Sequence, residues 1–129
     1  MRSGTIWHPR LVAIITALGH TETIVLADAG LAAPAGIEVV ELLWTRGEPP
    51  LLPVLSAVLA EMDVEHATIA EETRDPKLLV GMQEALDGRR TVAVPHDRLK
   101  QLSHSARAIV RTGECTPYAN MILHAGVTF

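Results

Sequence analysis

Apolar positions along the chain follow two patterns, one typical of buried strands and one typical of helices. Short runs rich in branched side chains, bounded by glycine, proline or polar residues, predict strands. Longer segments with apolar positions three and four residues apart, often opened by proline or closed by glycine, predict helices. The predicted strands are 23–29, 37–43, 65–70, 91–94, 107–111 and 121–125, and the predicted helices are 10–18, 51–62, 76–86 and 97–105.

The alternation of these elements predicts a single α/β domain over residues 1–129. Helices between successive strands favour parallel neighbours, so we expect a mixed, mostly parallel sheet in a three-layer α/β/α arrangement. Ligands of such folds bind at the carboxyl ends of the strands. The last two predicted strands are joined by residues 112–120, whose glycine, proline and asparagine indicate a shaped loop.

Composition narrows the possible functions. Phe, Trp and Tyr make up 3% of the chain, so the core is expected to consist of aliphatic side chains. The same shortage leaves few rings on which unpaired bases could stack, and a net charge of −4 gives no basic surface for phosphates. We therefore expect no nucleic-acid partner.

The N-terminal third has weak features of a secretory signal. Arg2 and Arg10 precede the apolar run 11–15, and residues 27–29 have the small-x-small form of a cleavage site. Polar residues between Thr16 and Glu22 interrupt that run early, and no run approaches the roughly 18 apolar residues that cross a bilayer. With one cysteine there is no intrachain disulfide, so we expect a cytoplasmic protein without membrane association.

Polar side chains at the ends of predicted elements are the candidates for chemistry. His20 follows a helix end, Asp28 closes an apolar strand, and His96 stands between a strand and a helix. Each also has a structural interpretation: His20 as a cation at a helix end, Asp28 as a cap for the turn at Gly30, and His96 as a neighbour of a helix cap. A carboxylate within so apolar a run must find a partner or face a cleft, which favours a functional role for Asp28.

Other sites are less well supported by the sequence. Phosphate-binding glycine loops, paired cysteines and His-Glu-x-x-His are absent, so we expect no cofactor and no metal. A metal site formed by His20, Asp28 and His96 is an alternative, although no helical ligand pair supports it. Structural or solvated roles are preferred for the remaining candidates: His8, His66, His104, His124, the pair Glu71 and Glu72 as solvated or helix-capping groups, and Cys115 as a buried or loop thiol.

Three blocks resemble the ribose pyranase family of sugar mutarotases. They are Leu-Gly-His-Thr with Ala-Asp-Ala-Gly in 18–30, Ile-Ala-Glu-Glu at 69–72, and Gly-Glu-Cys-Thr-Pro-Tyr-Ala-Asn with Ala-Gly-Val-Thr-Phe in 113–129. The resemblance implies a cofactor-free enzyme that interconverts the pyranose and furanose forms of D-ribose. By position it assigns the catalytic acid to His20, and it assigns substrate binding to Asp28, His96, Tyr118, Ala119 and Asn120.

The resemblance also implies an assembly. Family members form ring-based homo-oligomers, decamers of two pentameric rings in the best-known cases, in which the C-terminal loop of one subunit completes the site of its neighbour. Two alternatives stay open for the function: a mutarotase for L-fucose or another aldose, and a ribose-binding protein without turnover.

The chemistry of ring opening agrees with these residue types. A proton must reach the ring oxygen while the anomeric hydroxyl loses one, and histidine exchanges protons readily near neutral pH. We expect Asp28 to orient either His20 or a sugar hydroxyl. Asn120 offers both a donor and an acceptor, and Tyr118 offers a ring and a hydroxyl, which suits the recognition of a polyol.

Overall fold

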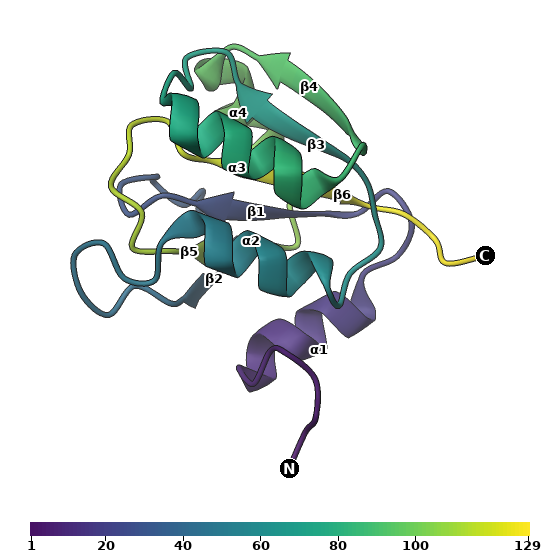
Figure 1. Ribbon diagram of the computed structural model, residues 1–129. Helices are drawn as coiled ribbons and strands as arrows, with labels where there is room; N and C mark the ends of the chain where they lie inside the picture. Colours follow the sequence, from purple (N-terminus) through teal and green to yellow (C-terminus); the bar gives the residue numbers. More distant parts are fainter.

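The computed structural model describes residues 1–129 as one six-stranded sheet with four helices (Figure 1). The strands are β1 (Thr23–Ala27), β2 (Glu38–Glu41), β3 (Val64–Ala70), β4 (Arg90–Val94), β5 (Ala108–Arg111) and β6 (Met121–Ala125). The helices are α1 (Pro9–Ala17), α2 (Leu51–Leu59), α3 (Pro76–Leu86) and α4 (His96–Ser103). The strand order is β2-β5-β1-β6-β3-β4.

The sheet is mixed and mostly parallel, which confirms the predicted class. Strand β6 pairs antiparallel with both β1 and β3, and every other pairing is parallel. Met121, the first residue of β6, lies opposite Leu26 near the end of β1 and Ile69 near the end of β3. The loop that precedes β6 therefore lies at the carboxyl ends of the parallel strands.

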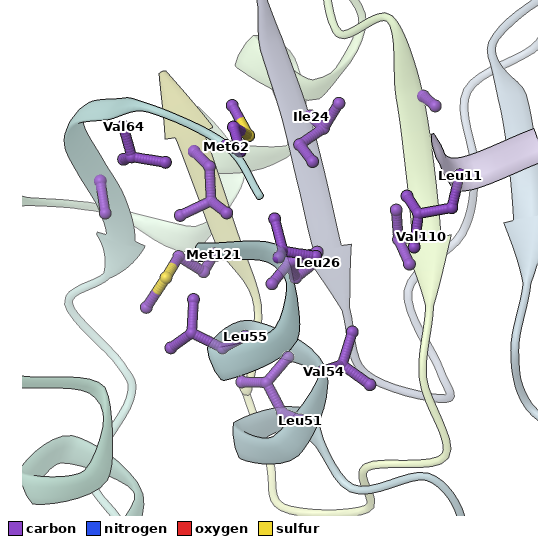
Figure 2. Packing of buried hydrophobic residues seen from close by; sticks show 14 of the residues in the cluster. Leu11, Ile24, Leu26, Leu51, Val54, Leu55, Met62, Val64, Val110 and Met121 are labelled. Atoms are coloured by element: carbon purple, nitrogen blue, oxygen red, sulfur yellow. The ribbon is translucent and has the colours of Figure 1, made fainter. Parts of the chain in front are cut away.

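Two apolar clusters cover the two faces of the sheet, as the predicted three layers require. Successive residues of a strand point to opposite faces, and in β1 Leu26 joins one cluster while Val25 joins the other. The larger cluster packs α1, α2 and α3 against the sheet, and Figure 2 shows Leu55 of α2 in it beside Leu26 and Met121. The smaller cluster contains Leu99 of α4 on the opposite face.

The core is aliphatic, as the composition predicts. No Phe, Trp or Tyr is among the buried residues, and Trp7 and Trp44 are 61% and 79% exposed. Methionines, including Met82 and Met121, complete the packing of the larger cluster. None of the four helices has both the length and the apolar character that a membrane-crossing helix needs.

The predicted element bounds agree closely with the structure, and the differences have local causes. Residues 76–86 and 121–125 agree in full. The first strand ends at Ala27 instead of the predicted residue 29, because the Asp28 and Ala29 N–H groups donate to Asn120 and Glu114 of the 112–120 loop. Helix α2 ends at Leu59, before the predicted residue 62.

His66 and His124 form a stacked pair across β3 and β6, with ring centroids 3.9 Å apart and planes at 16°. The Thr68 hydroxyl lies 2.9 Å from Nε2 of His124. Burial lowers the pKa of His124 to about 4, and the neighbouring His66 and Arg90 add to this against the opposing effect of Glu65. His124 is therefore neutral at pH 7, which agrees with the structural role expected for it.

The His124 ring makes the stability of the fold sensitive to mild acid. Its pKa is lower in the folded chain than in the unfolded one, so protons favour unfolding as the pH falls from about 6.5 towards 4. Because water partly screens this partly buried ring, we expect the free energy of unfolding to fall by only about 1 kcal/mol between pH 7 and pH 5. Urea denaturation at the two pH values measures this.

The control is His124→Gln, which keeps a partner for Thr68 but does not titrate. We expect its stability to change less than that of the unmutated chain over the same interval. An equal change in both proteins would assign the pH dependence to other groups.

Candidate functional site

The polar residues predicted to bind a ligand converge at the carboxyl edge of the sheet. Asp28 follows β1, His96 begins α4 directly after β4, and the 112–120 loop connects β5 to β6. A pocket of about 410 Å³ lies between these segments, within the range of small-molecule sites. It is lined by Asp28, Gly30, Leu31, Ala32, His96, Lys100, Pro117, Tyr118 and Asn120.

Asp28 and Asn120 are joined by two hydrogen bonds at this pocket. The Asp28 N–H donates to Oδ1 of Asn120 at 2.8 Å, and Nδ2 of Asn120 donates to Oδ2 of Asp28 at 3.1 Å. The Gly30 N–H donates to Oδ1 of Asp28 at 3.0 Å, so the predicted turn cap is also present. Asn120 is buried, and its amide orients a carboxylate that faces the pocket.

His96 and Tyr118 contact each other edge to face, with ring centroids 5.0 Å apart and planes at 74°. Nδ1 of His96 is buried and makes no hydrogen bond within the chain, while other parts of the residue line the pocket. Tyr118 is 42% exposed and has φ of 58°, in the left-handed region that side chains rarely adopt. The loop is thus shaped to present this side chain.

Lys100 is a pocket residue that the sequence analysis missed. It lies four residues after His96 on α4, and residues at this spacing share one face of a helix. The four-residue spacing from His96 could have identified Lys100 from the sequence. Ala119, predicted to bind substrate, is fully buried in the larger apolar cluster and does not line the pocket.

Glu114 holds the 112–120 loop against the rest of the fold. Its Oε1 accepts the Leu51 N–H at 2.9 Å, at the start of α2, where Pro50 supplies no side-chain cap. Its Oε2 accepts the Thr116 hydroxyl at 2.9 Å. Burial tends to raise the pKa of Glu114, but these hydrogen bonds outweigh it and lower the pKa below its ordinary value. The carboxylate therefore stays ionised at neutral pH.

His20 lies away from this pocket. It precedes β1 whereas Asp28 follows it, and a strand of five residues separates its ends by roughly 13 Å. The predicted contact between His20 and Asp28 is not formed within one chain. Instead, Nε2 of His20 lies 3.4 Å from Oε2 of Glu65, in a hollow of about 460 Å³ formed with the C-terminal segment 125–129.

Two other interpretations of the site lose support from this geometry. The alternative metal site does not form within one chain, because His20 lies away from Asp28 and His96 and no group of three or more potential ligand side chains occurs in the chain. The hollow of about 230 Å³ beside Trp7 and Leu11 is mostly apolar, which suits a polyol poorly. The pocket at Asp28 brings together four of the predicted binding residues, Asp28, His96, Tyr118 and Asn120.

The comparison with known families agrees with this arrangement. Residues 1–128 match the model of the RbsD / FucU transport protein family. The chain belongs to that family. It is 42% identical to the D-ribose pyranase of Symbiobacterium thermophilum over 131 residues and 45% identical to that of Variovorax paradoxus over 133 residues, with full coverage of each protein.

Solved structures support the fold over its whole length. The structure of Bacillus subtilis RbsD complexed with D-ribose matches with a TM-score of 0.96 at 35% identity, with both chains fully covered. The fucose mutarotase of Streptococcus pneumoniae in complex with L-fucose matches with a TM-score of 0.81 at 22% identity, covering 96% of this chain and 100% of the other. The second likeness shows a shared fold alone.

The contribution of the Asp28–Asn120 hydrogen bonds to the stability of the fold can be measured with a variant of Asn120. Asn120→Leu keeps a similar volume but leaves the buried Asp28 N–H without an acceptor, so we expect the free energy of unfolding to fall by about 1–3 kcal/mol. Urea denaturation measures this. A variant as stable as the unmutated chain would show that Asn120 does not hold the loop.

Proposed function

We propose that this chain is a D-ribose pyranase, which interconverts the β-pyranose and β-furanose forms of D-ribose without a cofactor. The observation that carries the proposal is the full-length likeness to several D-ribose pyranases, together with the match to a structure that contains D-ribose. The pocket supports it independently. Its carboxylate, imidazole, amide and phenol can donate to and accept from the hydroxyls of a pentose.

The reaction is a pair of coupled proton transfers. A general acid protonates the ring oxygen, the anomeric hydroxyl loses its proton, and the bond between the anomeric carbon and the ring oxygen breaks to give the open aldehyde. Attack of the 4-hydroxyl on the aldehyde then closes the furanose, with the protons returned. His20 is the proposed acid, and Asp28, His96, Tyr118, Ala119 and Asn120 are the proposed binding residues.

The separation of His20 from the pocket favours a site shared between subunits. His20 lies against the C-terminal segment at one edge of the sheet, and the binding residues lie at the opposite edge. We propose that two copies meet so that His20 and the C-terminal segment of one copy close the pocket of the next, in a ring-based decamer. Val127 and Phe129 are exposed in the single chain and would be covered by this contact.

The first test is NMR exchange between the pyranose and furanose signals of D-ribose. We expect the purified, metal-free protein to accelerate the exchange, and His20→Ala to reduce kcat by about 100-fold or more, the usual contribution of a general acid. L-Fucose is the comparison sugar, and faster exchange of fucose would reassign the substrate. Ribose binding without faster exchange would favour a binding protein instead.

The second test addresses the shared site. His20→Ala and Asp28→Asn are each expected to be inactive, yet in a mixed ring some interfaces combine an intact His20 with an intact Asp28. Random assembly of equal amounts leaves about a quarter of the interfaces intact, so co-refolding should restore about that share of the activity. Light scattering gives the mass of the assembly. No recovery in mixed rings that light scattering shows to have formed would overturn the shared site.

The cytoplasmic location stays a prediction. It agrees with a substrate delivered to ribokinase inside the cell, which is the role that the family resemblance implies.

A further inference from the structure

The turn between β3 and α3 contacts both segments that carry the aromatic side chains of the pocket. Glu72 accepts the His96 N–H, with Oε2 at 2.8 Å and Oε1 at 3.1 Å. The Thr73 hydroxyl donates to the Tyr118 carbonyl at 2.8 Å. One short turn therefore holds two segments that are 22 residues apart in the chain.

Glu72 acts on the start of α4. This helix begins at His96, and its cap residue Pro95 makes no side-chain hydrogen bond. The free N–H groups of a first helical turn favour a carboxylate beside them. Glu72 supplies that carboxylate from a different element, whereas α3 is capped by its own Asp75. The sequence indicated a solvated role for Glu72 or a capping role at the start of the 76–86 helix, and the structure shows Glu72 at the start of α4 instead.

Thr73 acts on the loop before β6. It is 4% exposed, and its hydroxyl is directed at the carbonyl of a residue in the left-handed region. A side chain stays in that region only where its surroundings hold the backbone. The bond from Thr73 is one such restraint on Tyr118, whose ring in turn packs against His96.

We propose that Glu72 and Thr73 are positioning residues, which set the relative placement of His96 and Tyr118 and so the affinity of the pocket for its sugar. This inference depends on the function proposed above. Neither residue lines the pocket at Asp28, so each acts on it through the residue it holds. Glu72 lines an adjoining hollow of about 380 Å³, which shares Pro117 and Tyr118 with the pocket. Because both held residues are proposed to bind the sugar and not to transfer a proton, the effect falls on substrate binding.

The test separates binding from turnover. Thr73→Val keeps the shape of the side chain and removes the hydroxyl, and we expect KM for D-ribose to rise about tenfold while kcat stays within about twofold. Thr73→Ser retains the hydroxyl and should restore KM. Glu72→Ala should raise KM in the same way, with a smaller rise in Glu72→Gln, which keeps an acceptor. If Thr73→Val does not fold, the Glu72 variants test the same effect on KM.

The matched control is Thr68→Val. Thr68 is also 4% exposed and also loses one side-chain hydrogen bond, but its partner is His124, outside the pocket. We expect the Thr68→Val variant to be less stable than the unmutated chain and to have the same KM for D-ribose. Unchanged KM in Thr73→Val and Glu72→Ala would overturn the positioning role while the unmutated chain remains active. An unmutated chain without ribose exchange would overturn the proposed function, and this inference with it.

Discussion

The antiparallel placement of β6 inside an otherwise parallel sheet determines where the pocket forms. A parallel strand in that position would carry its preceding loop to the amino edge of the sheet. Because β6 runs the other way, the loop that ends at Asn120 lies at the carboxyl edge, beside the ends of β1 and β3. Asp28, His96 and the 112–120 loop thus become neighbours although they are far apart in the chain.

The pocket and the helices are stabilised by some of the same groups. Helices α2 and α4 both have proline at the cap position and lack a side-chain cap of their own. Each receives a glutamate from a loop at the pocket, Glu114 for α2 and Glu72 for α4. Changes in these loops therefore also affect the starts of α2 and α4, and the sequence of the loops is constrained by packing as well as by binding.

The sequence was sufficient for the class of fold, and it identified residues that the structure brings together at one edge. Asp28 could be recognised because a carboxylate at the end of an apolar strand has few structural uses. The partner of Glu72 could not be foreseen, since it depends on β4 lying next to β3. His20 and Asp28 are far apart because the whole of β1 lies between them. A comparison of sequence motifs does not take this strand length into account. Lys100 was missed because a lysine on a polar amphipathic helix is ordinarily exposed to solvent.

The scarcity of aromatic rings has a spectroscopic consequence. Both tryptophans are exposed and lie outside the two apolar clusters, so their emission reports on the surface near α1 and the 44–48 turn more than on the melting of the core. Tyr118 is the only tyrosine and stands in the pocket. Its ultraviolet absorption and ring resonances form an intrinsic reporter of pocket occupancy, readable without any label.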